Sequence, residues 1–178
     1  ANPDKASIAS PAPGSTLHFT GVTLGRKAGI ELTHVGYKGS PPAIQDMLGG
    51  TLPALVTPLG SFLTYLGPGS KIRVLATSGA KRSRFTPNVP TLVEQGFKDM
   101  AYSEWYGFYL SAKASGDVVR RLNGALHQAL KAQDIVDSLA SFGMEPTPGT
   151  PEELTAALQR DLKTWGPIVK SIGFTVDS

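Results

Sequence analysis

Short apolar runs alternate with helical runs between residues 5 and 79, and each junction between them carries glycine, proline or serine. Strands are indicated at 6–10, 31–37, 52–57 and 72–78, and helices at 15–28, 41–48 and 61–66. Strands that alternate with helices of this length favour βαβ units, which build a parallel sheet covered by helices on both faces. The sequence therefore predicts an α/β fold with a doubly wound, mainly parallel sheet.

The second half of the chain is predicted to be largely helical. An aromatic run at 102–110 indicates a strand that leaves the first sheet, and helices are indicated at 117–132, 134–142 and 151–171. The last helix has a clear start signal, in which Thr150 is the N-cap, Pro151 occupies N1 and Glu153 occupies N3. Apolar stripes are expected on the first of these helices and, facing inward, on the last: Val118, Leu122, Leu126 and Leu130, then Leu154, Leu158, Leu162 and Trp165. The fold prediction therefore includes a C-terminal helical segment.

Composition excludes several classes of function. The 178 residues include no cysteine, so a thiol nucleophile, a disulfide framework and cysteine-ligated metal sites are excluded. The net charge is +3, but the lysines and arginines are scattered, and the basic stripe with interleaved aromatics that marks a nucleic-acid footprint is missing. No apolar run approaches the length of a membrane span, and the start ANPDKAS lacks the features of a signal peptide. A nucleic-acid partner is not expected.

The strongest candidate site is the stretch SPAPGSTLH, residues 10–18, between a predicted strand and a predicted helix. Ligands bind beyond the carboxyl ends of strands in open parallel sheets, and a helix N-terminus offers free N–H groups to an anion. The plainer alternative, in which Ser15 is only an N-cap and Gly14 only a turn residue, stays open at this point. Neither GxxxxGKS nor GxGxxG occurs, so nucleotide binding is not expected.

Catalysis has little support in the sequence. The three histidines lack metal-ligand spacing and a serine elbow, and carboxylates are few in the candidate loops. Lys38 in GYKGS has two readings, as a partner for a carboxylate or as a solvated surface charge. We expect no cofactor, no metal and no enzymatic activity.

Several long motifs resemble the substrate-binding receptors of tripartite tricarboxylate transporters, also called Bug proteins. The resemblance runs through NPDKASIASPAPGSTLHFTGVTLGRKAGIELTHVGYKGSPPAIQDMLGG, IRVLATSGAKRSRFTPNVPTLVEQGF, SEWYGFYLSAKA and PEELTAALQRDLKTWGPIVKSIGF, which together cover nearly all of the chain. The resemblance implies a lobe of a type II periplasmic-binding-protein-like fold. It also implies a periplasmic, non-enzymatic receptor that binds a small carboxylate for membrane transporter subunits.

The resemblance also assigns ligand-binding residues. It places Ser10, Gly14, Ser15 and Thr16 in a loop that contacts a ligand carboxylate. The YKG turn of the family matches Tyr37, Lys38 and Gly39, followed by Ser40. Thr57 stands where members usually carry an aspartate-containing turn, so a plain carboxylate is expected in preference to an amino acid. Prolines at positions 11 and 13 remove backbone donors that a glycine pair would provide.

Family receptors are nearly twice as long, so the resemblance implies a truncated chain. Residues 1–101 are expected to be the ligand-binding second lobe, and residues 102–178 the crossing strand and helices that return to the first lobe. Because such a truncation exposes apolar stripes, we expect a homodimer or a domain-swapped arrangement that buries Leu122, Leu126 and Leu130. Two alternatives stay open, a periplasmic sensory protein for a signalling system and a small α/β enzyme acting on an anionic substrate.

Overall fold

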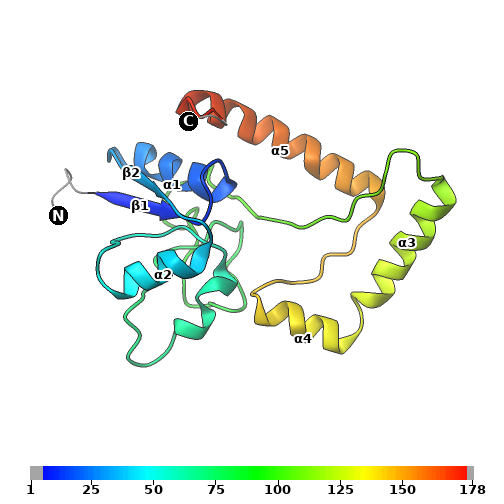
Figure 1. Cartoon of the computed structure of the whole chain (residues 1–178), viewed down its shortest axis with the longest axis horizontal. Coiled ribbons are helices and arrows are strands. Elements are labelled where there is room, and N and C mark those ends of the chain that lie inside the picture. Colours follow the sequence, from blue (N-terminus) through cyan, green and yellow to red (C-terminus); the bar gives the residue numbers. More distant parts are fainter. Residues whose placement is uncertain (1–5, 176–178) are drawn as a thin grey trace. The chain divides into compact units, whose positions relative to one another are not determined.

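The computed structural model describes residues 6–175. Along the chain, it contains two strands, five α-helices and two short 3₁₀ helices (Figure 1). These elements are β1 (Ser7–Ser10), α1 (Thr16–Lys27), β2 (Thr33–Gly36), α2 (Ser40–Leu48), η2 (Leu59–Ser61), η3 (Leu63–Tyr65), α3 (Gly116–Ala129), α4 (Gln133–Ser141) and α5 (Pro151–Ile172). An α/β fold with a parallel sheet and a helical C-terminal segment is confirmed.

The sheet consists of β1 and β2, which pair in parallel from Ser7 opposite Thr33 to Ser10 opposite Gly36. Helix α1 connects the two strands and packs against both, while α2 packs against β1. The buried residues around the sheet include Ile8, Ala9, Phe19, Ala43, Ile44 and Leu52. Both strands therefore end at the same edge, where the chain turns into α1 and α2.

Two predicted strands are wrong as continuous strands. The segment 52–57 meets β1 only at a bridge between Leu55 and Ala9, because Pro53 has no N–H to extend the ladder. The segment 72–78 pairs instead with the chain near Thr91, through one bridge to Thr77, and the proline before Thr91 limits that pairing in the same way. The helix predicted at 61–66 is replaced by η2 and η3. The sheet is consequently smaller than the sequence predicts.

The described residues form two compact units. Unit 1 comprises the residues through Glu104 together with those from Pro167 onward, and unit 2 comprises Trp105–Gly166. The second boundary falls inside α5, immediately before Pro167. Proline removes one helical hydrogen bond and favours a kink, which suits a boundary at this position. The predicted division into 1–101 and 102–178 concerns the roles of two lobes and stays a prediction.

Helices α3, α4 and α5 supply most of unit 2, and their starts follow the sequence signals. The side-chain oxygen of Ser115 accepts from Val118 N–H, and Thr150 and Glu153 form a reciprocal capping box with distances of 2.8 and 3.2 Å. Within unit 2, the Trp105 indole N–H donates to Asp161 at 2.8 Å. Local capping chemistry therefore sets where these helices begin.

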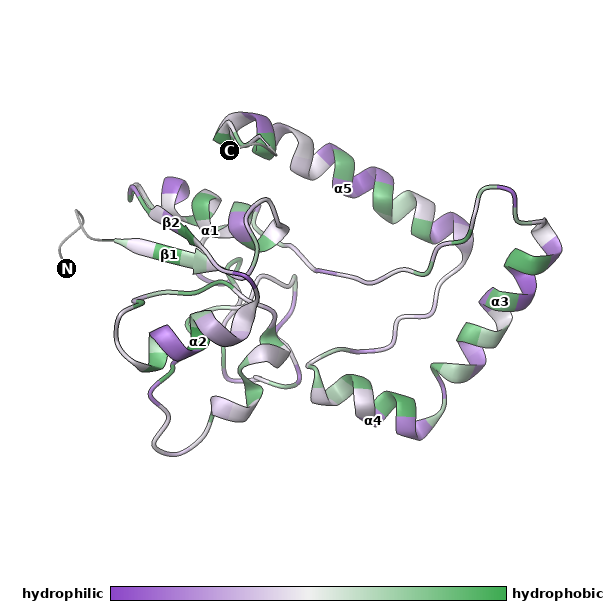
Figure 2. Cartoon of the chain, in the orientation of Figure 1, coloured by the Kyte–Doolittle hydropathy of each residue, from purple (hydrophilic) through white to green (hydrophobic). Residues whose placement is uncertain are grey.

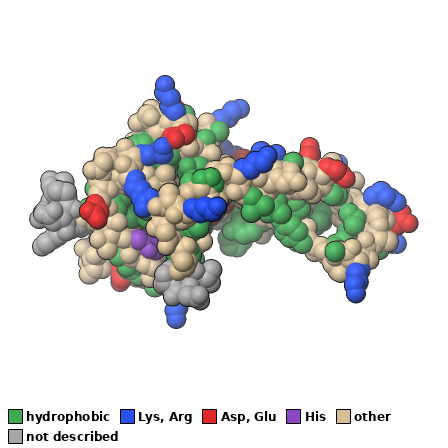
Figure 3. Space-filling view, turned by 90° about the horizontal axis from the view of Figure 1, so that it is seen from above, with side chains coloured by type: hydrophobic (Ala, Val, Ile, Leu, Met, Phe, Trp, Pro, Cys, Tyr) green, Lys and Arg blue, Asp and Glu red, His purple; other side chains and the backbone are tan. Residues whose placement is uncertain are grey.

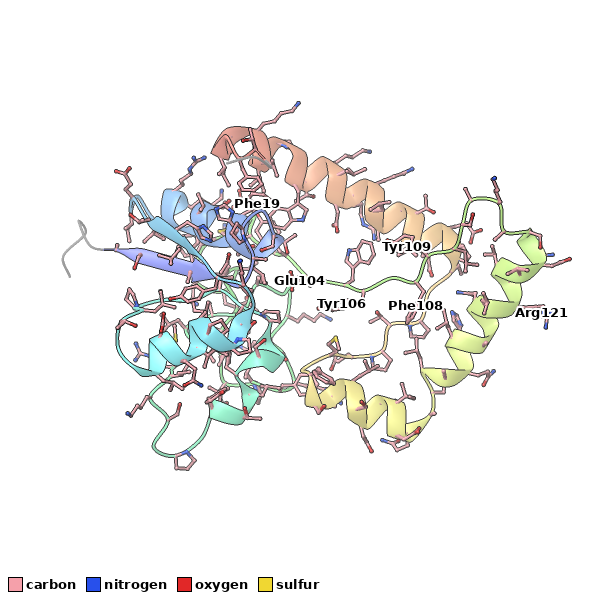
Figure 4. All side chains as sticks on the ribbon, viewed as in Figure 1. Phe19, Glu104, Tyr106, Phe108, Tyr109 and Arg121 are labelled. Atoms are coloured by element: carbon pink, nitrogen blue, oxygen red, sulfur yellow. The ribbon has the colours of Figure 1, made fainter. Side chains whose placement is uncertain are left out.

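Unit 2 exposes much of its apolar surface. No described residue of unit 2 is buried, and green residues recur along α3 and α4 in Figure 2. The inward orientation predicted for Leu158 and Leu162 is wrong, because these residues are 44% and 68% exposed. The predicted strand 102–110 is also wrong, since the segment finds no strand to pair with in the part of the chain that is described. Its aromatic side chains Tyr106, Phe108 and Tyr109 are exposed and are labelled in Figure 4.

Two surface properties bear on function. Over residues 6–175, no helix has the length and apolar character needed to cross a membrane. Lysine and arginine side chains are scattered over the face shown in Figure 3 rather than gathered in a stripe.

Candidate functional site

The serine loop, which we define as residues 10–16, leaves the end of β1 and enters α1. Ser15 is the N-cap of α1, and its hydroxyl both accepts from His18 N–H and donates to the Ala12 carbonyl at 2.6 Å. The Ser15 N–H also donates to the Ala12 carbonyl. The bonds to Ala12 close a tight turn over residues 12–15, and the bond from His18 confirms the capping role of Ser15.

Ser10 and Gly14 of the serine loop form hydrogen bonds with two histidines. The Ser10 hydroxyl lies 2.8 Å from Nε2 of His34 and 3.2 Å from the Ala12 carbonyl, and Ser10 is only 1% exposed. Gly14 N–H donates to Nδ1 of His18 at 3.1 Å. Both groups therefore have partners within the protein, and neither is an unoccupied donor for a ligand.

A second loop, residues 37–40, is attached to the serine loop through the backbone. Tyr37 N–H donates to the Ser10 carbonyl at 3.0 Å, and Gly39 N–H donates to the Pro11 carbonyl at 2.7 Å. At the end of β2, a Cβ on Gly36 would lie 2.4 Å from Pro13, so this packing requires glycine. The structure thus brings the two loops together, as the shared strand edge predicts.

The side chains of the second loop have separate environments. The Tyr37 hydroxyl donates to the Asp46 carboxylate of α2 at 2.6 Å, and this hydrogen bond raises the pKa of Tyr37 above its ordinary value. Lys38 is exposed and forms no hydrogen bond or ion pair with any described residue. Of these two side chains, only Lys38 is available to a ligand.

Ser40 and Thr57 meet, as the resemblance implies for residues near one ligand. Their hydroxyl oxygens are 2.7 Å apart, and the Ser61 hydroxyl donates to Ser40 at 3.1 Å. Ser61 belongs to η2 and was not among the predicted site residues. Its place in the cluster depends on how residues 57–61 fold, which no local motif indicates.

Glu104 is a second residue that sequence reasoning missed. The Thr16 hydroxyl donates to the Glu104 carboxylate at 2.5 Å, across 88 positions in the chain. In the described part of the chain, no lysine or arginine pairs with Glu104, which is labelled in Figure 4. A negative charge consequently lies at the N-terminus of α1, where a carboxylate is favoured by the helix dipole.

The arrangement suits binding rather than bond breaking. The first turn of α1 leaves N–H groups without intrahelical partners, and hydroxyls surround it. A serine beside an imidazole is also found in nucleophilic catalysis, but Ser10 is buried and His34 has no hydrogen-bonded carboxylate among the described residues. The same residues contain no cluster of acidic or histidine side chains that would hold a metal ion.

Known proteins show extended similarity to this chain. A family model described as tripartite tricarboxylate transporter family receptor matches residues 1–174. The chain is 27% identical to BugT of Bordetella pertussis, over 97% of this chain and 53% of that protein. Two solved structures are similar, each with 26% identity. One is an R. palustris protein with adipate (TM-score 0.83, 95% of this chain and 56% of the other) and one is the periplasmic binding protein BugD (TM-score 0.78, 97% and 58%).

These similarities define both the fold and its extent. The chain has part of a periplasmic-binding-protein fold, and it spans about half the length of BugT and of most other curated relatives that it matches. The matching family consists of solute-binding receptors and not of enzymes. Because the family model covers almost every residue, this chain belongs to the tripartite tricarboxylate transporter receptor family.

Proposed function

We propose that this chain is the ligand-binding second lobe of a periplasmic solute receptor and binds a small carboxylate. The observation that carries the proposal is the junction of the serine loop with residues 37–40, held by the bond from Gly39 N–H to the Pro11 carbonyl. It combines the N-terminus of α1 with several hydroxyl groups, which are suitable donors to a carboxylate. The relative with adipate, a dicarboxylate, supports this class of ligand.

The proposal gives the site residues distinct roles. Backbone N–H groups of the first turn of α1 donate to the ligand, together with the one hydroxyl proton that the bond between Ser40 and Thr57 leaves free. The Thr16 hydroxyl donates to the ligand when it exchanges its bond to Glu104 for one to the ligand. Ser10, Gly14 and Ser15 shape the loop through their internal bonds. Lys38 supplies the positive charge. Tyr37 and Gly39 fix the second loop, through the Asp46 bond and the backbone respectively.

The mechanism that we propose is closure of two lobes around the ligand, which transporter subunits in the membrane then sense. In this arrangement residues 1–101 form one lobe of a doubly wound, type II receptor fold, and residues 102–178 return to the other lobe. The exposed apolar residues of α3, among them Val118 and Leu122 at 42% and 44%, would then face protein. The homodimer predicted through this helix is an alternative cover for the same residues and stays a prediction for light scattering.

Isothermal titration with adipate, succinate, citrate and glutamate tests the proposal on this chain and on a full-length version. Saturable binding without consumption of the compound is expected. Lys38→Ala should weaken binding, whereas Lys71→Ala should not, because Lys71 is an exposed lysine outside both loops. If only the full-length version binds, or if nothing binds, the proposal for this chain fails.

A further inference from the structure

Two histidines lie stacked beneath the serine loop. The ring centroids of His18, on α1, and His34, on β2, are 3.7 Å apart with an interplanar angle of 24°. Phe19 and Phe174 also contact the His18 ring, at centroid distances of 5.1 and 5.6 Å, and His18 is only 7% exposed. The His18 ring is therefore surrounded by Phe19, Phe174 and the half-buried ring of His34.

The bond from Gly14 defines the protonation state of His18. A backbone N–H can only donate, so Nδ1 of His18 must offer a lone pair to Gly14 and the ring proton must be on Nε2. A second proton on the ring would occupy Nδ1 and place two N–H groups 3.1 Å apart. The loop conformation at Gly14 is consequently compatible only with neutral His18.

His34 connects the same pair to the end of β1. The single hydroxyl proton of Ser10 is directed to the Ala12 carbonyl when the hydroxyl accepts from Nε2–H of His34. Protonating His34 keeps that bond but places a positive charge 3.7 Å from the His18 ring. The two rings are therefore coupled, and both are attached to the serine loop.

We propose that His18 and His34 are positioning residues for the serine loop, and that acid opens the loop by protonating the stacked pair. The consequence for ligand binding rests on the proposed function, while the opening of the loop does not. Loss of the Gly14 bond frees the chain between Pro13 and Ser15, so that the N-cap residue Ser15 can move with it. The serine loop then no longer holds its closed conformation at the N-terminus of α1.

The surrounding charges do not offset this effect. The elements packed around the pair carry the following charged residues: Arg26 and Lys27 on α1, Glu31 and Lys38 beside β2, Glu104 bonded to Thr16, and Lys170 on α5. None of them forms an ion pair or hydrogen bond with either imidazole in the described structure. No described carboxylate is therefore placed to stabilise a protonated ring.

The pKa of His34 is lowered from 6.5 to about 4, mainly by burial and secondly by the charge of His18. Burial also lowers the pKa of His18. The unfolded chain therefore takes up protons before the folded chain does. Acid destabilises the folded state as the pH falls from 6.5 toward about 4.

Nuclear magnetic resonance tests the loop opening without any ligand. Between pH 7.5 and 3.5, a range that extends below the pKa of about 4 of His34, we expect the Gly14 amide shift to follow the titration of the His18 ring in the unmodified chain. In His18→Asn the amide oxygen of asparagine takes the place of Nδ1 as acceptor, so the part of the Gly14 titration that follows His18 should be lost, leaving only a response at the lower pH where His34 titrates. His127→Gln is the control, because His127 bonds to the Gly149 carbonyl in unit 2. A Gly14 shift that stays constant while His18 titrates, or an unaltered pH profile in His18→Asn, would overturn the proposal.

Adipate binding provides a second readout. Adipate also takes up protons in acid, so the comparison is between the unmodified chain and His18→Asn at each pH. We expect affinity in the unmodified chain to fall roughly tenfold more than in the variant at pH 4.5, as for one lost hydrogen bond. Equal pH profiles would refute the link from loop to ligand. Absence of adipate binding at every pH, with the Gly14 titration as expected, would support the switch and overturn the proposed function.

Discussion

Replacing Gly14 by alanine should loosen the serine loop by two separable effects. Gly14 has a φ of +76°, and a side chain in this left-handed region costs about 1–2 kcal/mol. The new Cβ would also lie 2.7 Å from Cζ and 2.8 Å from Cε1 of Phe174. Because such contacts are too short, the Phe174 ring must move.

The cost of moving Phe174 follows from its ring contacts. Its centroid lies 5.6 Å from those of His18 and Phe19, with edge-to-face angles of 79° and 72°. Each contact of this kind contributes about 0.5–1.5 kcal/mol beyond area burial. The free energy of unfolding should therefore fall by roughly 2–5 kcal/mol in Gly14→Ala when both effects act.

Gly50→Ala isolates the backbone effect. Gly50 has a φ of +81°, and a Cβ there meets nothing within 4 Å, so its loss should be only about 1–2 kcal/mol. Urea unfolding followed by far-UV circular dichroism and by exchange of α1 amides measures both variants. In a double-mutant cycle, Phe174→Ala should cost less in the Gly14→Ala background than in the unmodified chain. Equal losses for the two glycine variants, or a cycle without coupling, would refute the reasoning.

Three further perturbations have directional outcomes. Glu104→Gln should increase adipate affinity severalfold because it removes a negative charge bonded to Thr16. Asp99→Asn is the control, and an unchanged affinity of Glu104→Gln in calorimetry would contradict the role of Glu104. Thr150→Ala should remove half of the α5 capping box and lower the stability of that helix by about 1 kcal/mol. Amide exchange in the first turn of α5 measures this loss, and an unaltered exchange rate would contradict the role of the box. Ile44→Ala should cost about 2–5 kcal/mol in urea unfolding because Ile44 is 2% exposed, and a loss below 1 kcal/mol would mean that this core relaxes around the cavity.

The sequence predicts the fold best where its signals are local. Ser15 as a cap and the Thr150 to Glu153 box act within three residues of each other, so their helices begin where the pattern indicates. Strands need partners that are distant in sequence. The segments 52–57 and 72–78 have apolar strand-like runs, yet proline in or opposite each one reduces the pairing to a single bridge.

The same distinction applies to the candidate site. The serine loop and residues 37–40 could be predicted to meet, because parallel strands end at a common edge. Glu104 and Ser61 could not, since their positions depend on how the chain returns after long irregular segments. The His18 and His34 stack was also missed, because neither residue belongs to a ligand motif and only the sheet register places His34 opposite Ile8 and beneath α1.

The division inside α5 has a consequence for how this protein must be observed. Both tryptophans, Trp105 and Trp165, belong to unit 2, while all residues that are buried within 6–175 belong to unit 1. Tryptophan emission therefore reports the unit with the least buried surface and is a poor optical probe of the core around the proposed site. A tryptophan introduced in unit 1 at Phe62, within a run of short 3₁₀ turns, would let the two units be followed by separate signals.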